Sequence, residues 1–232
     1  MRSTFVLVSA LAAGLGARAV AQCPPPRPAS VADTTAFADE IGIFEAADKV
    51  SPPPQGAVLF VGSSSIRLWP NLKADFPGVD VIQRGFGGSD LPEAIHYAPR
   101  IVLPYCPRLI VVYAGDNDLA EGRTPAQVLA DFREFVRAVR RAMPKTRIAF
   151  VAIKPSPSRV ALLDKMRAAN ALVRQYVATD PRLIYVDVFT PMLGPTGRPP
   201  SELFQPDMLH MKPQGYALWR DFLQPVVSDT TR

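Results

Sequence analysis

The chain has 232 residues, of which 48% are hydrophobic and 20% are charged, and its formal net charge is +5. A chain of this length and composition can bury a full core as one globular domain, so it needs neither a structural metal nor a disulfide for stability. Only two histidines occur, which excludes a metal centre built from histidines. The densest basic stretch, residues 133–145, follows Asp131 and includes Glu134, which favours the solvated face of a helix over a nucleic-acid surface.

The first 21 residues have the pattern of a secretory signal peptide. Arg2 gives a positive start, residues 5–15 are apolar, and Ala19-Val20-Ala21 is a small-x-small cleavage site. We therefore expect cleavage after Ala21, a secreted or periplasmic protein, and no stable membrane insertion after cleavage. An uncleaved N-terminal anchor is the alternative interpretation.

Residues 22–33 are rich in proline and are predicted to form an extended linker, which leaves residues 34–232 as the single folded domain. The two cysteines are Cys23, in this linker, and Cys106. In an oxidising compartment they could pair, and two separate thiols are the alternative. The sequence contains no signal for an oligomeric state.

Five short apolar runs, rich in β-branched residues, are separated by amphipathic stretches. They cover residues 57–61, 79–82, 109–113, 148–152 and 183–186. The clearest helical periods lie at residues 125–143 and 159–177. Continuously apolar strands that alternate with helices predict an α/β fold, a flavodoxin-like three-layer α/β/α sandwich around a five-stranded parallel sheet. Ligands of such sheets bind beyond the carboxyl ends of the strands, so functional residues should follow the apolar runs.

Three serines follow the first predicted strand, in Gly62-Ser63-Ser64-Ser65. Gly62 allows a tight turn, and a serine at that turn is exposed at the edge of the sheet. Backbone N–H groups at the following helix N-terminus can stabilise a negative charge there. The simpler interpretation is that the serines only cap the helix.

Glycines and an asparagine follow the second and third predicted strands. Gly87 and Gly88 belong to a glycine-rich loop that can bring a backbone N–H close to a ligand. Asn117, in Gly115-Asp116-Asn117-Asp118, offers a side-chain amide that can donate to an oxyanion, although an Asx turn would also explain it. The loop lacks the spacing of a dinucleotide-binding fingerprint.

Near the C-terminus, Asp207 precedes His210 by three residues. At this spacing a carboxylate can hold the imidazole Nδ1 and stabilise the imidazolium that forms when the ring accepts a proton. Asp187, after the fifth predicted strand, is a rival partner, and Asp207 could instead cap the helix predicted from Pro213. The other histidine, His96, lies in a helix-like segment and is expected at the surface or in packing.

Together these blocks resemble the SGNH hydrolases, the GDSL-like esterases and lipases, over residues 57–219. The resemblance implies that Ser64 is the nucleophile and that His210 and Asp207 complete a catalytic triad. It also implies that the Ser64 N–H, the Gly88 N–H and the Asn117 amide form the oxyanion hole, with Gly87 a one-residue alternative to Gly88. Ser63 stands where the family has an aspartate that lies outside the triad.

The resemblance implies an esterase without cofactor or metal. No long lid insertion is visible in the sequence, so we expect an open site, which favours small or short-chain carboxylic esters, including acetyl esters of carbohydrates. Lysophospholipid and thioester substrates are alternatives within the family. Two other classes explain part of the pattern, namely a flavodoxin-like cofactor-binding protein and a non-catalytic glycan-binding module, but the first leaves Asp207 and His210 unused.

Overall fold

A parallel sheet forms the centre of the molecule in the computed structural model, which describes residues 37–229. Within this range the sheet has five strands in the order β2-β1-β3-β4-β5, and every neighbouring pair is parallel. The strands are β1 (Val58–Gly62), β2 (Val81–Gly85), β3 (Leu109–Tyr113), β4 (Arg147–Val151) and β5 (Leu183–Val186). The predicted α/β class and five-stranded parallel sheet are confirmed.

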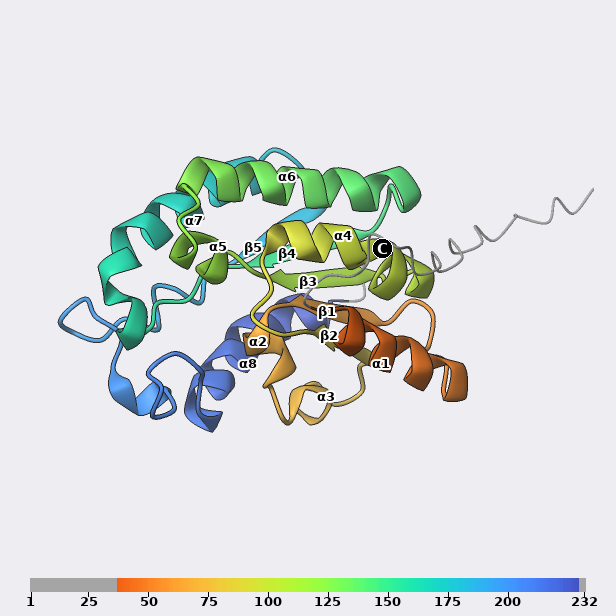
Figure 1. Cartoon of the computed structure of the whole chain (residues 1–232), viewed down its shortest axis with the longest axis horizontal. Coiled ribbons are helices and arrows are strands. Elements are labelled where there is room, and N and C mark those ends of the chain that lie inside the picture. The colour runs from red at the N-terminus through yellow and green to blue at the C-terminus, as the bar shows by residue number, and fades with distance from the viewer. Residues whose placement is uncertain (1–36, 230–232) are drawn as a thin grey trace, which may run out of the picture.

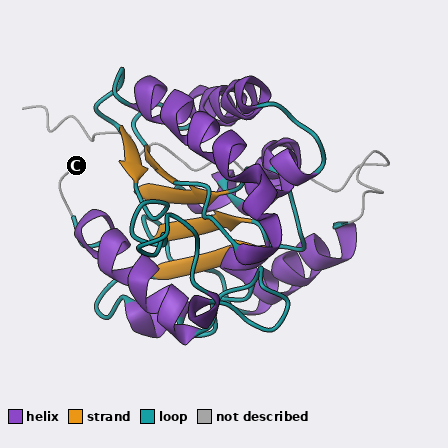
Figure 2. Cartoon of the chain, turned by 90° about the vertical axis from the view of Figure 1, so that its left-hand side faces the viewer, coloured by secondary structure: helices purple, strands orange, loops and turns teal. Residues whose placement is uncertain are grey.

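Helices cover both faces of the sheet and make the sandwich (Figures 1 and 2). The helices are α1 (Ala38–Val50), α2 (Ser64–Arg67), α3 (Leu72–Asp75), α4 (Leu91–Ile101), α5 (Asp116–Ala120), α6 (Pro125–Ala142), α7 (Leu163–Val177) and α8 (Pro213–Val227). Short 3₁₀ turns are η2 (Leu103–Tyr105), η3 (Pro157–Leu162) and η4 (Ser201–Leu203).

Aromatic side chains connect each helical layer to the sheet. On one face Phe132 of α6 packs against Phe150 of β4, with ring centroids 4.8 Å apart. On the other face Trp219 of α8 packs against Tyr113 of β3 at 4.7 Å. Because these rings are fully buried, their apolar area stabilises the three layers as one core.

Most element boundaries agree with the prediction to within one residue, and two differ by more. The second strand was expected at residues 79–82 but runs to Gly85, because its ladder with β1 continues to the pair Gly62↔Gly85. The helix expected from Arg159 begins instead at Leu163, after the 3₁₀ turn η3. Arg159 itself has non-helical angles, φ −116° and ψ 25°.

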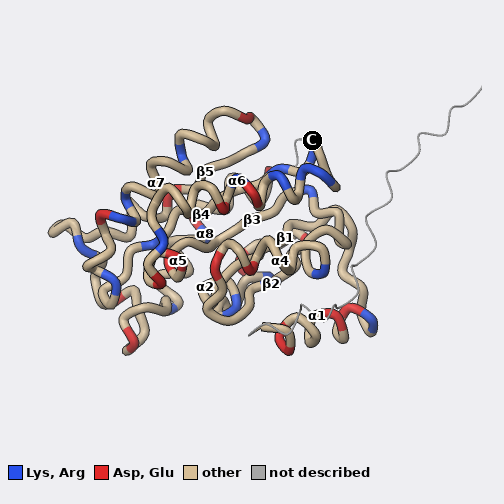
Figure 3. Tube along the Cα trace, turned by 45° about the horizontal axis from the view of Figure 1, so that its top comes forward, with Lys and Arg blue, Asp and Glu red and all other residues tan. Residues whose placement is uncertain are grey.

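The basic stretch at residues 133–145 lies mainly on the exposed side of α6, as expected. Glu134 forms ion pairs with Arg137 and Arg141, at 2.5 and 3.5 Å. Arg140 pairs with Asp180 at 3.3 Å. Acidic residues therefore interrupt the basic ones along this helix (Figure 3).

Several expectations fall on residues 1–36, outside the described range. They are the signal peptide, the linker at residues 22–33 and the position of Cys23, and all stay predictions. Within residues 37–229, no helix is long and apolar enough to cross a membrane.

Candidate active site

The turn between β1 and α2 brings Ser64 to the edge of the sheet. Gly62 ends β1 at φ +135°, and a Cβ there would lie 1.8 Å from the backbone oxygen of Tyr113, so a residue with a side chain does not fit. Ser63 and Ser65 are buried, at 1% and 2% exposure, whereas Ser64 is half-buried. Ser63 makes no side-chain capping bond to the described residues, so the capping interpretation does not account for it.

A short loop, residues 205–211, presents His210 to this turn. We call it the His210 loop. Its ends are joined by an isolated bridge between Phe204 and Met211 and by the hydrogen bond from the Gln205 N–H to the His210 carbonyl, 2.7 Å. Met208 has a left-handed backbone conformation, φ +57°, at the tip of the loop. These contacts hold the loop closed without a regular helix or strand.

The structure brings Ser64, His210 and Asp207 into one hydrogen-bonded chain. The Ser64 Oγ lies 3.0 Å from the His210 Nε2, and the His210 Nδ1 lies 2.6 Å from the Asp207 Oδ2. The other carboxylate oxygen, Oδ1, accepts the N–H groups of Leu209 and His210, each at 2.9 Å. Asp207 therefore orients His210 rather than capping α8, whose N-cap residue is Lys212.

The same contacts determine the protonation of Asp207. Burial raises the pKa of the carboxyl, but the hydrogen bonds from the His210 ring and from the two N–H groups outweigh it and lower the pKa to about 2. Asp207 is therefore a carboxylate near neutral pH. Its neighbour His210 has a fixed acceptor for an Nδ1 proton, which leaves Nε2 as the acceptor facing Ser64.

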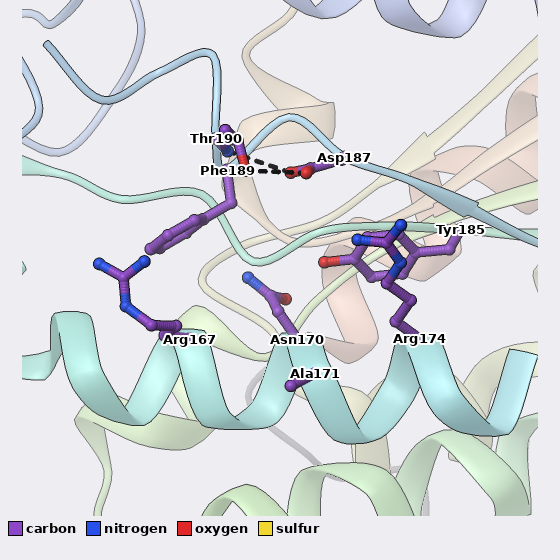
Figure 4. A pocket seen from close by; sticks show the side chains of 8 residues that line it. All are labelled: Arg167, Asn170, Ala171, Arg174, Tyr185, Asp187, Phe189 and Thr190. Carbon is purple, nitrogen blue, oxygen red and sulfur yellow. Dashed lines mark hydrogen bonds between the residues drawn. The ribbon is translucent and has the colours of Figure 1, made fainter. Parts of the chain in front are cut away.

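Asp187, the rival partner for His210, is engaged elsewhere. Its carboxylate accepts the backbone N–H of Thr190 at 3.0 Å and the Thr190 hydroxyl at 2.8 Å. It lines a separate pocket between β5 and α7, where Arg167 and Arg174 flank the opening (Figure 4). His96 lies on α4 with its ring edge-on to Tyr97, consistent with the packing role expected for it.

The glycine-rich loop after β2 distinguishes Gly87 from Gly88. The Gly87 N–H donates to the Glu40 Oε2 of α1 at 3.0 Å, so this donor is engaged by the protein itself. Gly87 also has φ +36°, and a Cβ there would collide with the ring of Phe37. A Cβ on Gly88 would instead lie 3.6 Å from the Asn117 Nδ2. Gly88 therefore lies beside the Asn117 amide, whereas the Gly87 N–H is already bound to Glu40.

Asn117 lies in the first turn of α5, beside Gly88, and only 8% of it is exposed. Its Nδ2 donates to the carbonyls of Gly88 and Ser89, at 2.6 and 3.1 Å. Its Oδ1 accepts a hydrogen bond from Arg159 at 2.8 Å. The amide is therefore held on both sides, and its predicted part in binding an oxyanion stays a prediction. We call this region the Gly88–Asn117 corner.

Three residues of the site were missed by the sequence analysis: Glu40, Lys154 and Arg159. Lys154 and Arg159 both pair with Asp116, at 3.3 and 3.0 Å. Each of the three lies far along the chain from the residue that it contacts. No local motif marks such contacts, although a lysine in the apolar sequence after β4 was a visible signal.

No group of three or more His, Cys, Asp or Glu side chains within residues 37–229 is arranged to hold a metal ion. The arrangement consists instead of a hydroxyl, an imidazole and a carboxylate in series beside a loop of backbone donors. Such a set can activate the hydroxyl as a nucleophile and stabilise negative charge on an attacked carbonyl.

Comparison with known proteins agrees with this geometry. The model of the GDSL-like lipase/acylhydrolase family matches residues 55–218. No curated protein sequence matches the chain. Among solved structures, a GDSL-like lipase from Bacteroides thetaiotaomicron is 18% identical with a TM-score of 0.70, covering 81% of this chain and 96% of that one.

Two further solved structures share the fold. A lipase/acylhydrolase from Enterococcus faecalis is 18% identical with a TM-score of 0.57, over 74% of this chain and 95% of that chain. A carbohydrate esterase of family 3 from Talaromyces cellulolyticus is 15% identical with a TM-score of 0.57, over 75% and 99%. At these identities the likeness extends to the fold alone.

Proposed function

The chain belongs to the GDSL-like lipase/acylhydrolase family and is an ester-hydrolysing enzyme, and on this premise we propose that it cleaves small carboxylic esters through a Ser64–His210–Asp207 triad. The observation that carries the proposal is the unbroken series of hydrogen bonds from the Ser64 Oγ to the Asp207 carboxylate. The three groups come from two segments that lie 143 residues apart in the chain, between Ser64 and Asp207, yet they meet at one edge of the sheet.

The proposed reaction is a two-step acyl transfer. The His210 Nε2 takes the Ser64 proton as the Oγ attacks the ester carbonyl, and the imidazolium then gives this proton to the leaving alcohol. Water attacks the resulting acyl-enzyme in the same way, with His210 as base, and releases the acid. Asp207 stays ionised throughout and stabilises the imidazolium of each step, in keeping with its lowered pKa of about 2.

The Gly88–Asn117 corner is the proposed site of the oxyanion. The Ser64 N–H, the Gly88 N–H and the Asn117 amide are the donors that we assign to it. The Asn117 Nδ2 donates to the carbonyls of Gly88 and Ser89 in the structure, so it would exchange one of these acceptors for the oxyanion. The engagement of the Gly87 N–H by Glu40 supports Gly88 over Gly87 for this task. Preorganised donors of this kind typically contribute about 3–4 kcal/mol each to lowering the barrier.

Substrates with small acyl groups fit the exposure of the triad. The side chains of His210 and Asp207 are 26% and 49% exposed. Each segment of the triad also carries an exposed apolar side chain: Met208 lies in the His210 loop, and Leu68 lies four residues after Ser64. A short acyl group could contact them. A carbohydrate esterase among the solved structures of this fold also supports acetylated sugars as candidate substrates.

We test the assignment with Ser64→Ala and with Ser63→Ala as its matched control. Ser64→Ala should lower kcat for an aryl acetate by at least about 10⁴-fold and abolish labelling by a fluorophosphonate, while the thermal unfolding curve stays unchanged. Ser63→Ala removes a buried neighbouring hydroxyl and should keep both activities. Near-wild-type turnover by Ser64→Ala would overturn the triad.

The substrate class needs a separate panel. Aryl esters of increasing acyl length, acetylated sugars, a lysophospholipid and an acyl thioester are compared by kcat/KM. We expect the optimum at acetyl or another short chain. An optimum at long acyl chains, or a preference for the thioester or the lysophospholipid, would contradict the short-ester proposal but not the triad.

Export is the remaining part of the proposal, supported by the apolar stretch and the Ala19-Val20-Ala21 pattern. The intact mass of the protein recovered from the periplasm or the medium should equal that of a chain that begins at Gln22. Recovery of the full-length chain from the cytoplasm alone would contradict export.

A further inference from the structure

Arg159 occupies an irregular position between β4 and α7. Its backbone leaves the helical region inside η3, and its side chain turns inward, with 17% exposed. One guanidinium nitrogen, Nη2, donates to the Asn117 Oδ1 at 2.8 Å. The other, Nη1, lies 3.0 Å from the Asp116 Oδ2. The guanidinium therefore contacts two consecutive residues of α5.

The guanidinium is itself held in place by a buried cluster of charges. Asp116 is 3% exposed, and Lys154, at 1%, also pairs with the Asp116 Oδ2, at 3.3 Å. Burial raises the pKa of Asp116, but the charges of Lys154 and Arg159 outweigh it and hold the pKa below its ordinary value. Two basic side chains thus share one carboxylate, that of the residue preceding Asn117.

We propose that Arg159 is a positioning residue for the Asn117 amide in the oxyanion hole, an inference that rests on the proposed esterase function. A guanidinium can only donate hydrogen bonds, so only the oxygen of the amide can face it. The Nδ2 group must then face the Gly88 side, where the oxyanion is expected. A flipped amide would set its NH₂ group against the guanidinium and its oxygen against the carbonyl of Gly88. Both contacts are repulsive.

The same turn also touches the other half of the site. The Ser158 N–H donates to the Met208 carbonyl, in the His210 loop, at 3.0 Å. One short segment therefore contacts both the amide that we assign to the oxyanion and the loop that carries the base. Because the contact with the His210 loop is made by a backbone N–H, a side-chain change at Arg159 leaves it available.

These contacts predict a selective kinetic effect. The described side-chain partners of Arg159 are Asn117 and Asp116, so we expect it to act through Asn117 and not on the substrate itself. Its loss removes the group that holds the amide oxygen and leaves only the carbonyls of Gly88 and Ser89 to orient the Nδ2 group. This should weaken one donor, which lowers kcat with little change in KM. Complete loss of a donor typically costs about 10²–10³ in rate, and a donor that is only misoriented should cost less, about 10–100-fold.

The test is a double-mutant cycle between Arg159 and Asn117, measured as kcat and KM for an aryl acetate. We expect Arg159→Met to lower kcat by about 10–100-fold in the wild-type background but by less than about threefold in an Asn117→Ala background. Arg159→Lys keeps the charge but loses the two-sided fork, so an intermediate loss is expected. Arg167→Met, which removes an arginine that stacks on Phe189 away from the triad, is the control and should retain full activity.

The outcomes separate a positioning role from a structural one. An equal loss in both backgrounds, a loss confined to KM, or no loss at all would overturn the proposal. If Arg159→Met fails to fold, the cycle is run with Arg159→Lys and the same criteria apply. Failure of the proposed function is recognised separately: either the wild-type protein would not hydrolyse the ester, or Ser64→Ala would hydrolyse it as fast as wild type, whatever happens at Arg159.

Discussion

The two halves of the site are built in opposite ways. The His210 loop is local and open: Asp207 and His210 lie three residues apart, and the carboxylate is half exposed. At the Gly88–Asn117 corner Gly88 is exposed, but Asn117 is buried, and the corner depends on side chains from distant segments, namely Glu40, Lys154 and Arg159. The proposed proton transfer thus takes place on an open loop, whereas the Asn117 amide, one of the proposed oxyanion donors, is fixed among buried polar groups. A group that must exchange protons benefits from access to solvent, and fixed dipoles act most strongly away from it.

Electrostatics follows the same division. In the His210 loop, hydrogen bonds to the charged form bring the pKa of Asp207 down to about 2. At the corner, burial raises the pKa of Asp118 to about 6, although it too accepts a backbone N–H. The surroundings thus stabilise the charged form of Asp207 and destabilise the charged form of Asp118. The two halves can therefore be perturbed independently.

The largest effect should come from the open half, with Asp207→Asn. The Asn Oδ1 can still accept the N–H groups of Leu209 and His210, so the loop keeps its shape. Its NH₂ group, however, would face the His210 Nδ1 and force the ring proton onto Nε2, which then cannot accept the Ser64 proton. We expect kcat to fall by about 10²–10⁴-fold with an aryl acetate, without loss of thermal stability near neutral pH.

Asp187→Asn is the matched control for this prediction. Asp187 binds Thr190 in the pocket beside α7 and should contribute nothing to turnover. A large fall in kcat for Asp187→Asn, together with normal kcat for Asp207→Asn, would make Asp187 the acid that orients His210. The His210 loop would then have to adopt a different arrangement in the working enzyme.

A smaller effect is expected at the buried half from Glu40→Ala. This change removes the acceptor of the Gly87 N–H and loosens the loop that presents Gly88, but the Gly88 donor remains in the chain. The fall in kcat should therefore be only about threefold to tenfold, well below the loss of a whole donor. The measurement is kcat and KM beside a thermal unfolding curve.

Glu45→Ala, on the same helix, separates loop positioning from helix docking. Glu45 forms a bidentate ion pair with Arg100, both bonds at 2.7 Å. Unlike Glu40, it is tied to α4 and not to the glycine loop by these bonds. It should lower the unfolding temperature but leave kcat unchanged. Equal kinetic losses in the two variants would mean that α1 acts only by stabilising the fold.

The same contrast explains what could be predicted from the sequence. The layered fold followed from apolar runs alternating with amphipathic stretches, and the confirmed strands β3 and β5 were predicted to the residue. Ser64, Asp207 and His210 were named because short motifs mark them. Glu40 and Arg159 were not, because their partners are respectively 47 and 42 residues away and no local pattern records such contacts. The start of α7 was missed for a related reason: Ser158 and Arg159 make tertiary contacts in η3, where the backbone is a 3₁₀ turn and Arg159 has non-helical angles.

The smallest effect on turnover, and the clearest effect on stability, should come from Asp118→Asn. Asp118 is fully buried, and its Oδ1 accepts the N–H of Leu91, the first residue of α4, at 3.1 Å. Asparagine can accept the same bond without a charge. We therefore expect kcat to stay within about twofold of wild type, since Asp118 faces neither the triad nor the Asn117 amide.

The effect on stability depends on pH, and its sign follows from the raised pKa. Burial moves the pKa of Asp118 from 3.8 to about 6, so between these values the folded protein binds more protons than the unfolded chain. Its contribution to the free energy of unfolding therefore falls as pH rises through this window and stays low above about pH 6. The stability of Asp118→Asn relative to wild type should therefore increase by about 1–3 kcal/mol as the pH rises from 4 to 8.

Urea unfolding of both proteins across this pH range gives the difference directly. Comparing the two proteins at each pH also cancels the titration of Glu93, whose pKa burial raises to about 7 in both. Any pH-independent cost of placing an amide at this site shifts the plot of the stability difference against pH up or down without changing its slope. A difference that does not vary with pH would mean that Asp118 titrates normally, and that the buried corner tolerates charge as readily as the open loop does.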